Sequence, residues 1–333
     1  MRRISPRSAL AGLVFVALAV TTCALSVGSA PFGWHASWQA FFDPADPAHA
    51  VMVGLRAPRV AAAFAVGALL AMAGALLQNL LRNPLAEPYV LGLSGGAAAG
   101  ALAAIALSLP LFWISAGAAA GSFTSLVMLL IIARREFSAA SFAHAGERLI
   151  LSGVMLAALW SALIALVVGL ASGARLQGMM FWLMGDLGGA AASVALIEGA
   201  GIVALLILAA TLADAARLDL MARGDETAAA LGVAVAPLKL RIVILAALAA
   251  GVAVAVAGTI GFVGLVAPHA VRRVIGNAHG TLLPGAALTG GVLVVFADTL
   301  ARTIIAPQQL PVGAIMAIIG APVFLLLLWK RPT

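Results

Sequence analysis

Long apolar segments recur along the whole chain, and they constrain its fold more than any other feature. About 20 apolar residues cross the hydrocarbon core of a bilayer as an α-helix. Because the bilayer offers the backbone no water to bond, a helix is the expected form of each segment. We therefore expect an all-α, polytopic membrane protein. Nine segments can be marked, at about 8–30, 57–81, 91–109, 111–133, 149–171, 193–213, 240–258, 282–301 and 311–329.

Composition supports a single membrane domain over residues 1–333. Hydrophobic residues make up 64% of the chain and charged residues only 9%, whereas a soluble domain carries about a quarter charged residues. The net charge is +7, but the basic residues are scattered singly, so lipid and not nucleic acid is the expected surrounding. The start of the chain has the layout of a signal peptide, yet segment 8–30 is long enough to stay as a span.

Basic residues at both ends predict the topology. Arg2, Arg3 and Arg7 precede the first segment, and Lys330 and Arg331 follow the last. Because basic loops stay in the cytoplasm, both termini are expected there. An even number of crossings follows.

The tenth crossing is expected at Thr259–Pro268, an apolar stretch too short for a regular span. Its glycines and Pro268 indicate a short or broken helix, which must lie inside the bundle because lipid cannot satisfy its backbone. With about ten helices, all but four of the 19 Lys and Arg residues fall on the cytoplasmic side. The four outside are Arg56, Arg59, Arg175 and Arg302.

Transport energy is expected to come from another protein. Proton-coupled transporters carry buried acids in their spans, and here Glu198, Asp298 and Arg241 fall near predicted span ends, where an interfacial role is expected. No lysine follows a Gly-rich phosphate loop, so ATP and Mg would bind a partner and this chain would hold no cofactor. Cys23 is the single cysteine and His269 has no second ligand at metal spacing, so no metal site is predicted.

A cytoplasmic loop at 213–238 contains the strongest candidate for protein contact. The run from Gly224 to Gly232 predicts a short helix, with Asp225 capping its start and Gly232 its end. Its alanines keep one face small, so a partner's groove could approach closely; a surface helix lying on the membrane is the alternative. The candidate contact residues are Asp225, Glu226, Thr227, Ala228, Ala229, Leu231 and Gly232.

Two further segments are candidates for a substrate path. Ser94, Gly95 and Gly96 follow a proline-rich turn and permit either close helix packing or a backbone-lined path. The segment from Arg175 to Gly189 is rich in soft side chains suited to a macrocycle, although an interfacial aromatic belt explains the same residues. Its candidates are Arg175, Met179, Met180 and Phe181.

These motifs resemble the permease subunits of bacterial ABC importers for ferric siderophores, haem and cobalamin. The similarity covers residues 51–100 and nearly all of the second half of the chain, while 1–50 and 110–215 match only in hydropathy. Its carriers are Leu55 to Arg59, Gly74 to Gln78, Asn83 to Ala86, Leu91-Gly92, Gly261 to His269 with Arg272-Arg273, Ala297-Asp298 with Arg302, and Leu310 to Gly313 through Gly320 to Pro322.

The resemblance implies an assembly in the bacterial inner membrane. Its parts would be a homodimer of ten-helix subunits, two cytoplasmic ATPase subunits and a periplasmic substrate-binding protein. It also implies that Asp225 to Gly232 dock on the ATPase, and that Arg56, Arg59 and Arg302 receive carboxylates of the binding protein, with interfacial anchoring as the alternative. Iron chelates, haem included, rank ahead of cobalamin. A stand-alone secondary transporter or channel is the competing function.

Overall fold

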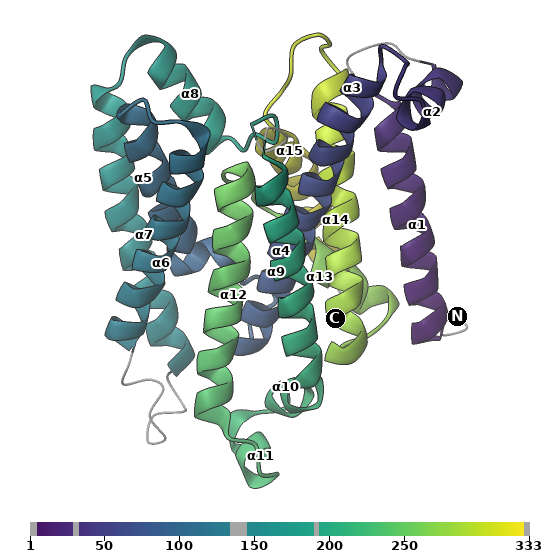
Figure 1. The fold of residues 1–333 in the computed structure, drawn as a ribbon. Helices are drawn as coiled ribbons and strands as arrows, with labels where there is room; N and C mark the ends of the chain where they lie inside the picture. The colour runs from purple at the N-terminus through teal and green to yellow at the C-terminus, as the bar shows by residue number, and fades with distance from the viewer. Residues whose placement is uncertain (1–4, 29–32, 134–144, 190–192, 330–333) are drawn as a thin grey trace.

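The described part of the chain is helical throughout and contains no β-strand (Figure 1). A computed structural model describes residues 5–28, 33–133, 145–189 and 193–329. The all-α prediction is therefore confirmed. Part of the topology prediction lies outside the described residues, because it rests on Arg2, Arg3, Arg134, Arg135, Lys330 and Arg331.

Each of the nine predicted segments coincides with a helix. Among the described residues, seven helical stretches are long and apolar enough to cross a membrane. They are α1 (Pro6–Ser26), the continuous stretch His49–Leu80 that ends in α4 (Ala57–Leu80), α6 (Leu111–Ala133), α7 (Ala145–Leu170), α9 (Val194–Ala213), α12 (Val235–Ala257) and α14 (His279–Thr303). Two shorter apolar helices, α5 (Leu93–Ala106) and α15 (Val312–Trp329), complete the set.

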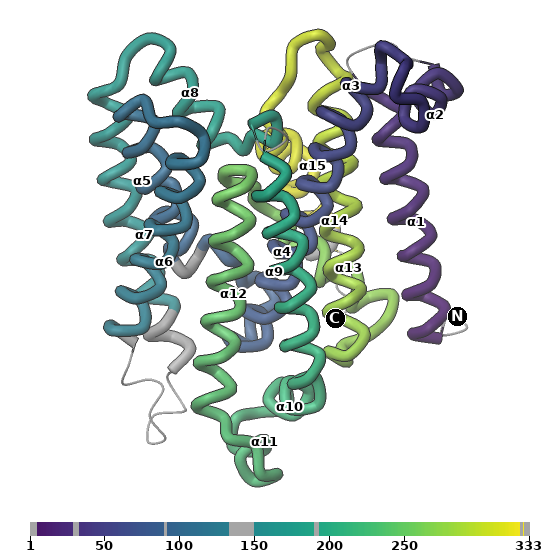
Figure 2. The backbone as a smooth tube through the Cα atoms, in the orientation of Figure 1, coloured from purple at the N-terminus to yellow at the C-terminus, as the bar shows by residue number. Residues whose placement is uncertain are grey.

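Helix α4 forms the centre of the bundle. Nearly every residue from Val60 to Leu80 is buried, against α9, α12, α13 and α14 (Figure 2). Glycines bring the backbones together: a Cβ at Gly67 would lie 2.1 Å from the carbonyl oxygen of Gly290 in α14. Small residues of this kind let membrane helices approach closely, where van der Waals packing and not water exclusion provides the stability.

A second group of helices, α5, α6 and α7, stands on the other side of α12 (Figure 1). Two glycine pairs with GxxxG spacing face each other across α5 and α6. A Cβ at Gly100 would lie 2.0 Å from Gly117 O, and one at Gly121 would lie 2.0 Å from Gly96 O. The α5–α6 contact therefore depends on positions that have no side chain.

The two ends of the bundle differ in their short helices (Figure 1). One end, called the α8 end here, carries α2 (Trp34–Phe42), α3 (His49–Val51), η1 (Met52–Arg56) and α8 (Gly173–Leu183). The opposite α11 end carries α10 (Ala215–Met221) and α11 (Asp225–Ala230), and α1 begins there.

The turn η1 is a π-helix, and a proline accounts for it. Pro58 has no N–H to donate to the carbonyl oxygen of Gly54, and Ala57 N–H instead donates to Met52, five residues back. Single π-turns inside α-helices are frequent at functional sites. Here the turn lets the central helix continue unbroken from His49 into α4, so Arg56 and Arg59 lie within a helix.

The short tenth element differs from its predicted position. We expected the helix at Thr259–Pro268, but 259–262 are not helical and α13 runs over Val263–Val274. Gly258 (φ +66°) and Phe262 (φ +68°) mark the two sides of the break, named here the 258–262 break. Pro268 lies inside α13 and cannot bond the carbonyl of Gly264; the side chain of Gln78 donates to that oxygen at 2.9 Å.

Candidate functional site

The predicted contact loop at 213–238 folds into α10, α11 and the first residues of α12. The expected short helix is confirmed as α11, and Gly232 follows its end with φ +84°, the left-handed conformation that glycine adopts freely. The predicted cap at its start is wrong. Gly224 occupies the N-cap position with φ +132°, and Asp225 is the first helical residue.

Asp225 instead clamps α11 to two other parts of the chain. One carboxylate oxygen lies 2.5 Å from a guanidinium nitrogen of Arg82, and the other lies 2.6 Å from Nζ of Lys239. Arg82 follows α4, and Lys239 lies in the second turn of α12. A carboxylate shared by two cations forms charge-assisted hydrogen bonds, so α11 is held at a fixed place against the bundle.

A second carboxylate fixes the base of the same end. Asp214, buried between α9 and α10, lies 2.8 Å from Arg217 and 2.8 Å from Arg241. The chain thus leaves the bundle at Asp214 and returns at Lys239, with ion pairs on each side. The segment between them is positioned both by these ion pairs and by the burial of apolar side chains such as Leu218 and Met221.

The free face of α11 is small and exposed. Glu226, Thr227 and Ala229 are exposed, and Leu231 is 61% exposed, while Ala228 is buried against the bundle. An exposed leucine beside alanines offers an apolar contact with little bulk around it. This geometry suits insertion into a groove of a second protein.

The three predicted docking arginines are brought together at the α8 end, but they are not exposed. Arg56, Arg59 and Arg302 are only 4–7% exposed. Arg59 Nε donates to both carboxylate oxygens of Asp298, at 2.9 and 3.1 Å, and Arg302 Nε lies 3.0 Å from the same carboxylate. We call these four residues the arginine cluster. Asp298, expected at an interface, is 1% exposed.

The arginine cluster also holds the end of α1. Arg56 donates to the carbonyl oxygens of Leu25 and Ser26 at 3.1 and 3.2 Å, and Arg302 donates to Ala24 at 3.3 Å. The last carbonyls of a helix have no partner within it and carry partial negative charge. Since α1 is otherwise largely exposed, these bonds fix its position at this end.

Ser94, Gly95 and Gly96 pack inside the subunit. A Cβ at Gly95 would lie 2.8 Å from Trp160 Cβ of α7, and one at Gly96 would lie 2.4 Å from Gly121 O of α6. Ser94 is buried. Of the two interpretations that the sequence allowed, these contacts favour close helix packing.

The candidates of the second path segment lie in α8 with different exposures. Arg175 is exposed, Met179 is fully buried, Met180 is half-buried and Phe181 is 37% exposed. Phe181 lines a cavity of about 260 Å³, together with Trp182, Asp186 and residues of α6.

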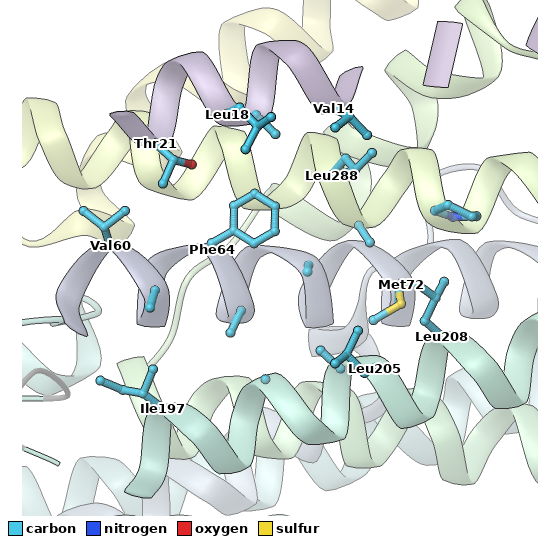
Figure 3. Close-up of a pocket in the computed structure, with 18 of the residues that line it drawn as sticks. Val14, Leu18, Thr21, Val60, Phe64, Met72, Ile197, Leu205, Leu208 and Leu288 are labelled. Atoms are coloured by element: carbon cyan, nitrogen blue, oxygen red, sulfur yellow. The ribbon is translucent and has the colours of Figure 1, made fainter. Parts of the chain in front are cut away.

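A larger cavity, about 850 Å³, lies elsewhere and contains none of the predicted path residues (Figure 3). It separates α1 from α9 beside α4 and α14, and side chains such as Leu18, Phe64 and Leu205 point into it. Its lining is apolar apart from Thr21 and Glu198. A charged chelate would find almost no hydrogen-bonding partner there.

Several ion-paired residues were not recognised from the sequence. Asp298 carried a local signal, since it precedes Arg302 by four residues on one helix face. Arg82 carried none, because its partner Asp225 lies far away in sequence. Asp214 and Lys239 have partners within or next to the same loop, Arg217 and Asp225, but the sequence did not give the geometry of that loop.

Apolar helices around a buried central helix, with a small exposed helix at one end, define a multi-pass membrane protein. The model of the FecCD transport family matches residues 13–330. The chain belongs to that family.

Curated relatives and a solved structure agree over nearly the full length. The hemin transport system permease protein HmuU of Yersinia pestis is 37% identical over 99% of this chain and 97% of its own, and the Fe(3+) dicitrate transport system permease protein FecD of Escherichia coli is 38% identical over 96% and 98%. The vitamin B12 import system permease protein BtuC of Salmonella arizonae is 36% identical over 96% and 92%. A solved inward-facing ABC transporter, described as of metal-chelate type, aligns with TM-score 0.85 at 30% identity over 98% of this chain and 100% of that one.

Proposed function

We propose that this chain is the membrane permease subunit of a binding-protein-dependent ABC importer for an iron chelate, a ferric siderophore or haem. The family match over residues 13–330 carries the proposal. The chain is a transport subunit and not an enzyme. ATP and Mg would bind a separate ATPase, and this chain would carry no cofactor.

The choice of substrate is based on the relatives. Two of them are permeases for hemin and ferric dicitrate and another is a permease for vitamin B12. We rank the iron chelates first and cobalamin second. A large chelate is held by shape and scattered contacts, so no short sequence motif identifies it. The ranking therefore rests on the substrates of the relatives.

We propose ten crossings with both termini in the cytoplasm of a bacterial inner-membrane protein. Nine apolar helices and the short α13 supply the count. The start of α1 at the α11 end supports a cytoplasmic N-terminus, because that end carries Arg82, Arg217 and Arg241. By its family, the subunit would work as a homodimer.

Docking of the ATPase is proposed at α11. Its exposed face of small residues and the ion pairs of Asp225 support this assignment. A helix that passes movement from an ATPase to the membrane domain must be accessible to the ATPase and firmly attached to that domain. Two cytoplasmic ATPase subunits, one on each copy of α11, would then drive the dimer.

Docking of the periplasmic binding protein is proposed at the α8 end, near Arg56, Arg59 and Arg302. Arg59 and Arg302 share the carboxylate of Asp298, and Arg56 bonds carbonyl oxygens of α1 beside them, so the four residues of the cluster together carry more positive than negative charge. That field would attract acidic lobes of a binding protein and orient them. The burial of the guanidiniums favours this role over direct bidentate pairing.

The substrate entrance is proposed beside α8. Arg175 and Phe181 are the candidates that a substrate could contact there. Met179, Met180 and Ser94 to Gly96 would pack behind the entrance and support its wall. In a dimer these surfaces could face the second copy.

The stand-alone transporter is not favoured by the family assignment, and one reconstitution separates the two functions. Proteoliposomes would contain the permease with its ATPase and receive the binding protein loaded with haem, a ferric siderophore or cobalamin. We expect uptake of one iron chelate only with ATP on the ATPase side. Uptake driven by an ion gradient without the ATPase would overturn the proposal.

A further inference from the structure

The loop 81–92 between α4 and α5 touches two places that matter for transport. Its first contact is at the α11 end, where Arg82 lies 2.5 Å from Asp225, the first residue of α11. Arg82 itself has φ +48°, a conformation that non-glycine residues rarely adopt. The ion pair therefore joins the start of this loop directly to α11.

The other end of the loop bonds the 258–262 break. Ile260 N–H donates to the hydroxyl of Tyr89 at 2.6 Å, and Phe262 N–H donates to a carboxylate oxygen of Glu87. Phe262 is the N-cap of α13. Amide groups before a helix and in its first turn have no partner within it, and lipid offers none. Glu87 and Tyr89 supply those partners.

A third side chain strengthens the same attachment from α4. Gln78 donates to Ala86 O of the loop at 3.3 Å and to Gly264 O of α13 at 2.9 Å, and it accepts from Arg272. The side-chain amide of Gln78 thereby joins the loop, α4 and α13. Pro84 and Pro88 restrict the backbone between Arg82 and Tyr89, so the loop is short and stiff.

On its far side the 258–262 break is held by the end of α8 and the residues that follow it. Thr259 Oγ1 donates to Leu183 O, and Asp186 N–H donates to Ala257 O at 2.9 Å. Gly258 has no room for a side chain, since a Cβ would lie 2.2 Å from Trp182 O. The break thus lies between a loop tied to α11 and the helix proposed as the entrance wall.

We propose that Arg82 and Glu87 are positioning residues that transmit movement of α11 to the 258–262 break and through it to the α8 segment. The inference rests on the proposed docking of the ATPase at α11. Movement of α11 pulls Arg82 through Asp225, the stiff loop carries the displacement to Glu87, and Glu87 shifts the start of α13. A chain of bonded, rigid parts is the physical form that such coupling takes.

The test separates coupling from docking and from folding. Arg82→Ala and Glu87→Ala are compared with Arg82→Lys and Glu87→Gln, which keep a cation and an acceptor. Arg7→Ala and Glu198→Ala remove the same charges from exposed positions outside the connection. Each variant is reconstituted with the ATPase and the binding protein, and three quantities are measured: ATPase co-purification, ATP hydrolysed and chelate taken up.

A direct probe of the 258–262 break completes the design. Gly261→Cys in a Cys23→Ser background places a thiol where a Cβ meets only Glu87 Oε1, at 3.9 Å. Its rate of alkylation by a water-soluble maleimide is measured with and without a non-hydrolysable ATP analogue. We expect the solvent exposure of this thiol to change with nucleotide only if movement of α11 displaces the 258–262 break.

We expect the two alanine variants to keep co-purification near that of wild type while uptake per ATP falls by about tenfold, the size of an ordinary coupling term. The nucleotide-dependent change in alkylation of the thiol introduced by Gly261→Cys should disappear with them, return partly in Arg82→Lys and Glu87→Gln, and persist in both controls. Wild-type uptake per ATP in Arg82→Ala and Glu87→Ala would overturn the inference. Absence of co-purification with the wild-type chain would instead overturn the docking proposal.

Discussion

The arginine cluster and α11 lie at opposite ends of the bundle, and the structure treats their charges in opposite ways. In the sequence, the arginines of the cluster and the acidic residues of α11 look alike, because each set lies near the end of an apolar segment. In the structure the cluster is buried, with Asp298 and helix carbonyls as hydrogen-bond partners of its guanidiniums, whereas α11 projects from the bundle with Glu226 exposed. A charge near a span end therefore says little about whether a partner can reach it.

The difference follows from where each helix begins. The central helix extends to His49, so Arg56 and Arg59 are carried inside the bundle and must find partners there. Segment 213–238 has no apolar stretch to continue, so Arg217, Arg223 and Glu226 stay at the surface, while Asp214 is buried beside its ion-pair partners. The arginine cluster is therefore expected to contribute mainly to stability, whereas α11 offers an exposed face for the docking proposed above.

The largest expected effect comes from removing the shared carboxylate of the cluster. Asp298→Ala leaves Arg59 and Arg302 buried without their counter-ion, a change that costs about 3–5 kcal/mol. We expect a strongly lowered thermal midpoint in detergent, measured by fluorescence or light scattering. Glu198→Ala, which removes an exposed carboxylate, should change stability by less than about 0.5 kcal/mol. Equal midpoints for the two variants would show that the cluster is not a stabilising element.

A smaller loss is expected from adding one methyl group at the centre of the bundle. A Cβ at Gly74 would lie 2.0 Å from Gly264 O of α13, so Gly74→Ala must push two backbones apart at a cost of about 1–3 kcal/mol. Gly199→Ala in α9 meets nothing within 4 Å and should stabilise by roughly 0.4–1 kcal/mol. The same thermal assay distinguishes them. A Gly74→Ala protein as stable as Gly199→Ala would contradict the close α4–α13 contact.

The smallest effect on stability is expected at α11, where the effect on assembly is large. Ala229→Trp adds bulk to the exposed face and should alter stability by less than about 0.5 kcal/mol, while ATPase co-purification is lost. Ala228→Trp, one residue earlier and buried, should destabilise by about 1–3 kcal/mol. Retained ATPase binding in Ala229→Trp would remove α11 from the docking surface.

Most of the helical architecture was predictable because hydropathy measures the property that the bilayer selects. The segments at 57–81, 111–133 and 193–213 match α4, α6 and α9 to within a residue. The misplaced element is α13, whose last turn contains Arg272 and Arg273 and which continues past Pro268. A short helix with polar ends is not found by a search for long apolar segments. The side chains that bond its backbone, such as Gln78, lie far from it in sequence.

The site was predictable only in its local part. Helix α11 follows from its alanines and flanking glycines, which act within a few residues. The role of Asp225 depends on Arg82, far earlier in the chain, and that of Arg59 depends on Asp298, 239 positions later. Such pairs are set by tertiary packing, so spacing within a single sequence contains no trace of them.

Photo-crosslinking from Ala229 tests most directly the claim that α11 is the docking surface. A benzophenone amino acid is placed at Ala229, at Asn277 on the exposed α13–α14 turn, and at Ala36 on exposed α2 at the other end. In membranes containing the assembled transporter, we predict an adduct with the ATPase subunit from position 229 and none from position 36. An adduct from position 277 without one from 229 would contradict the account.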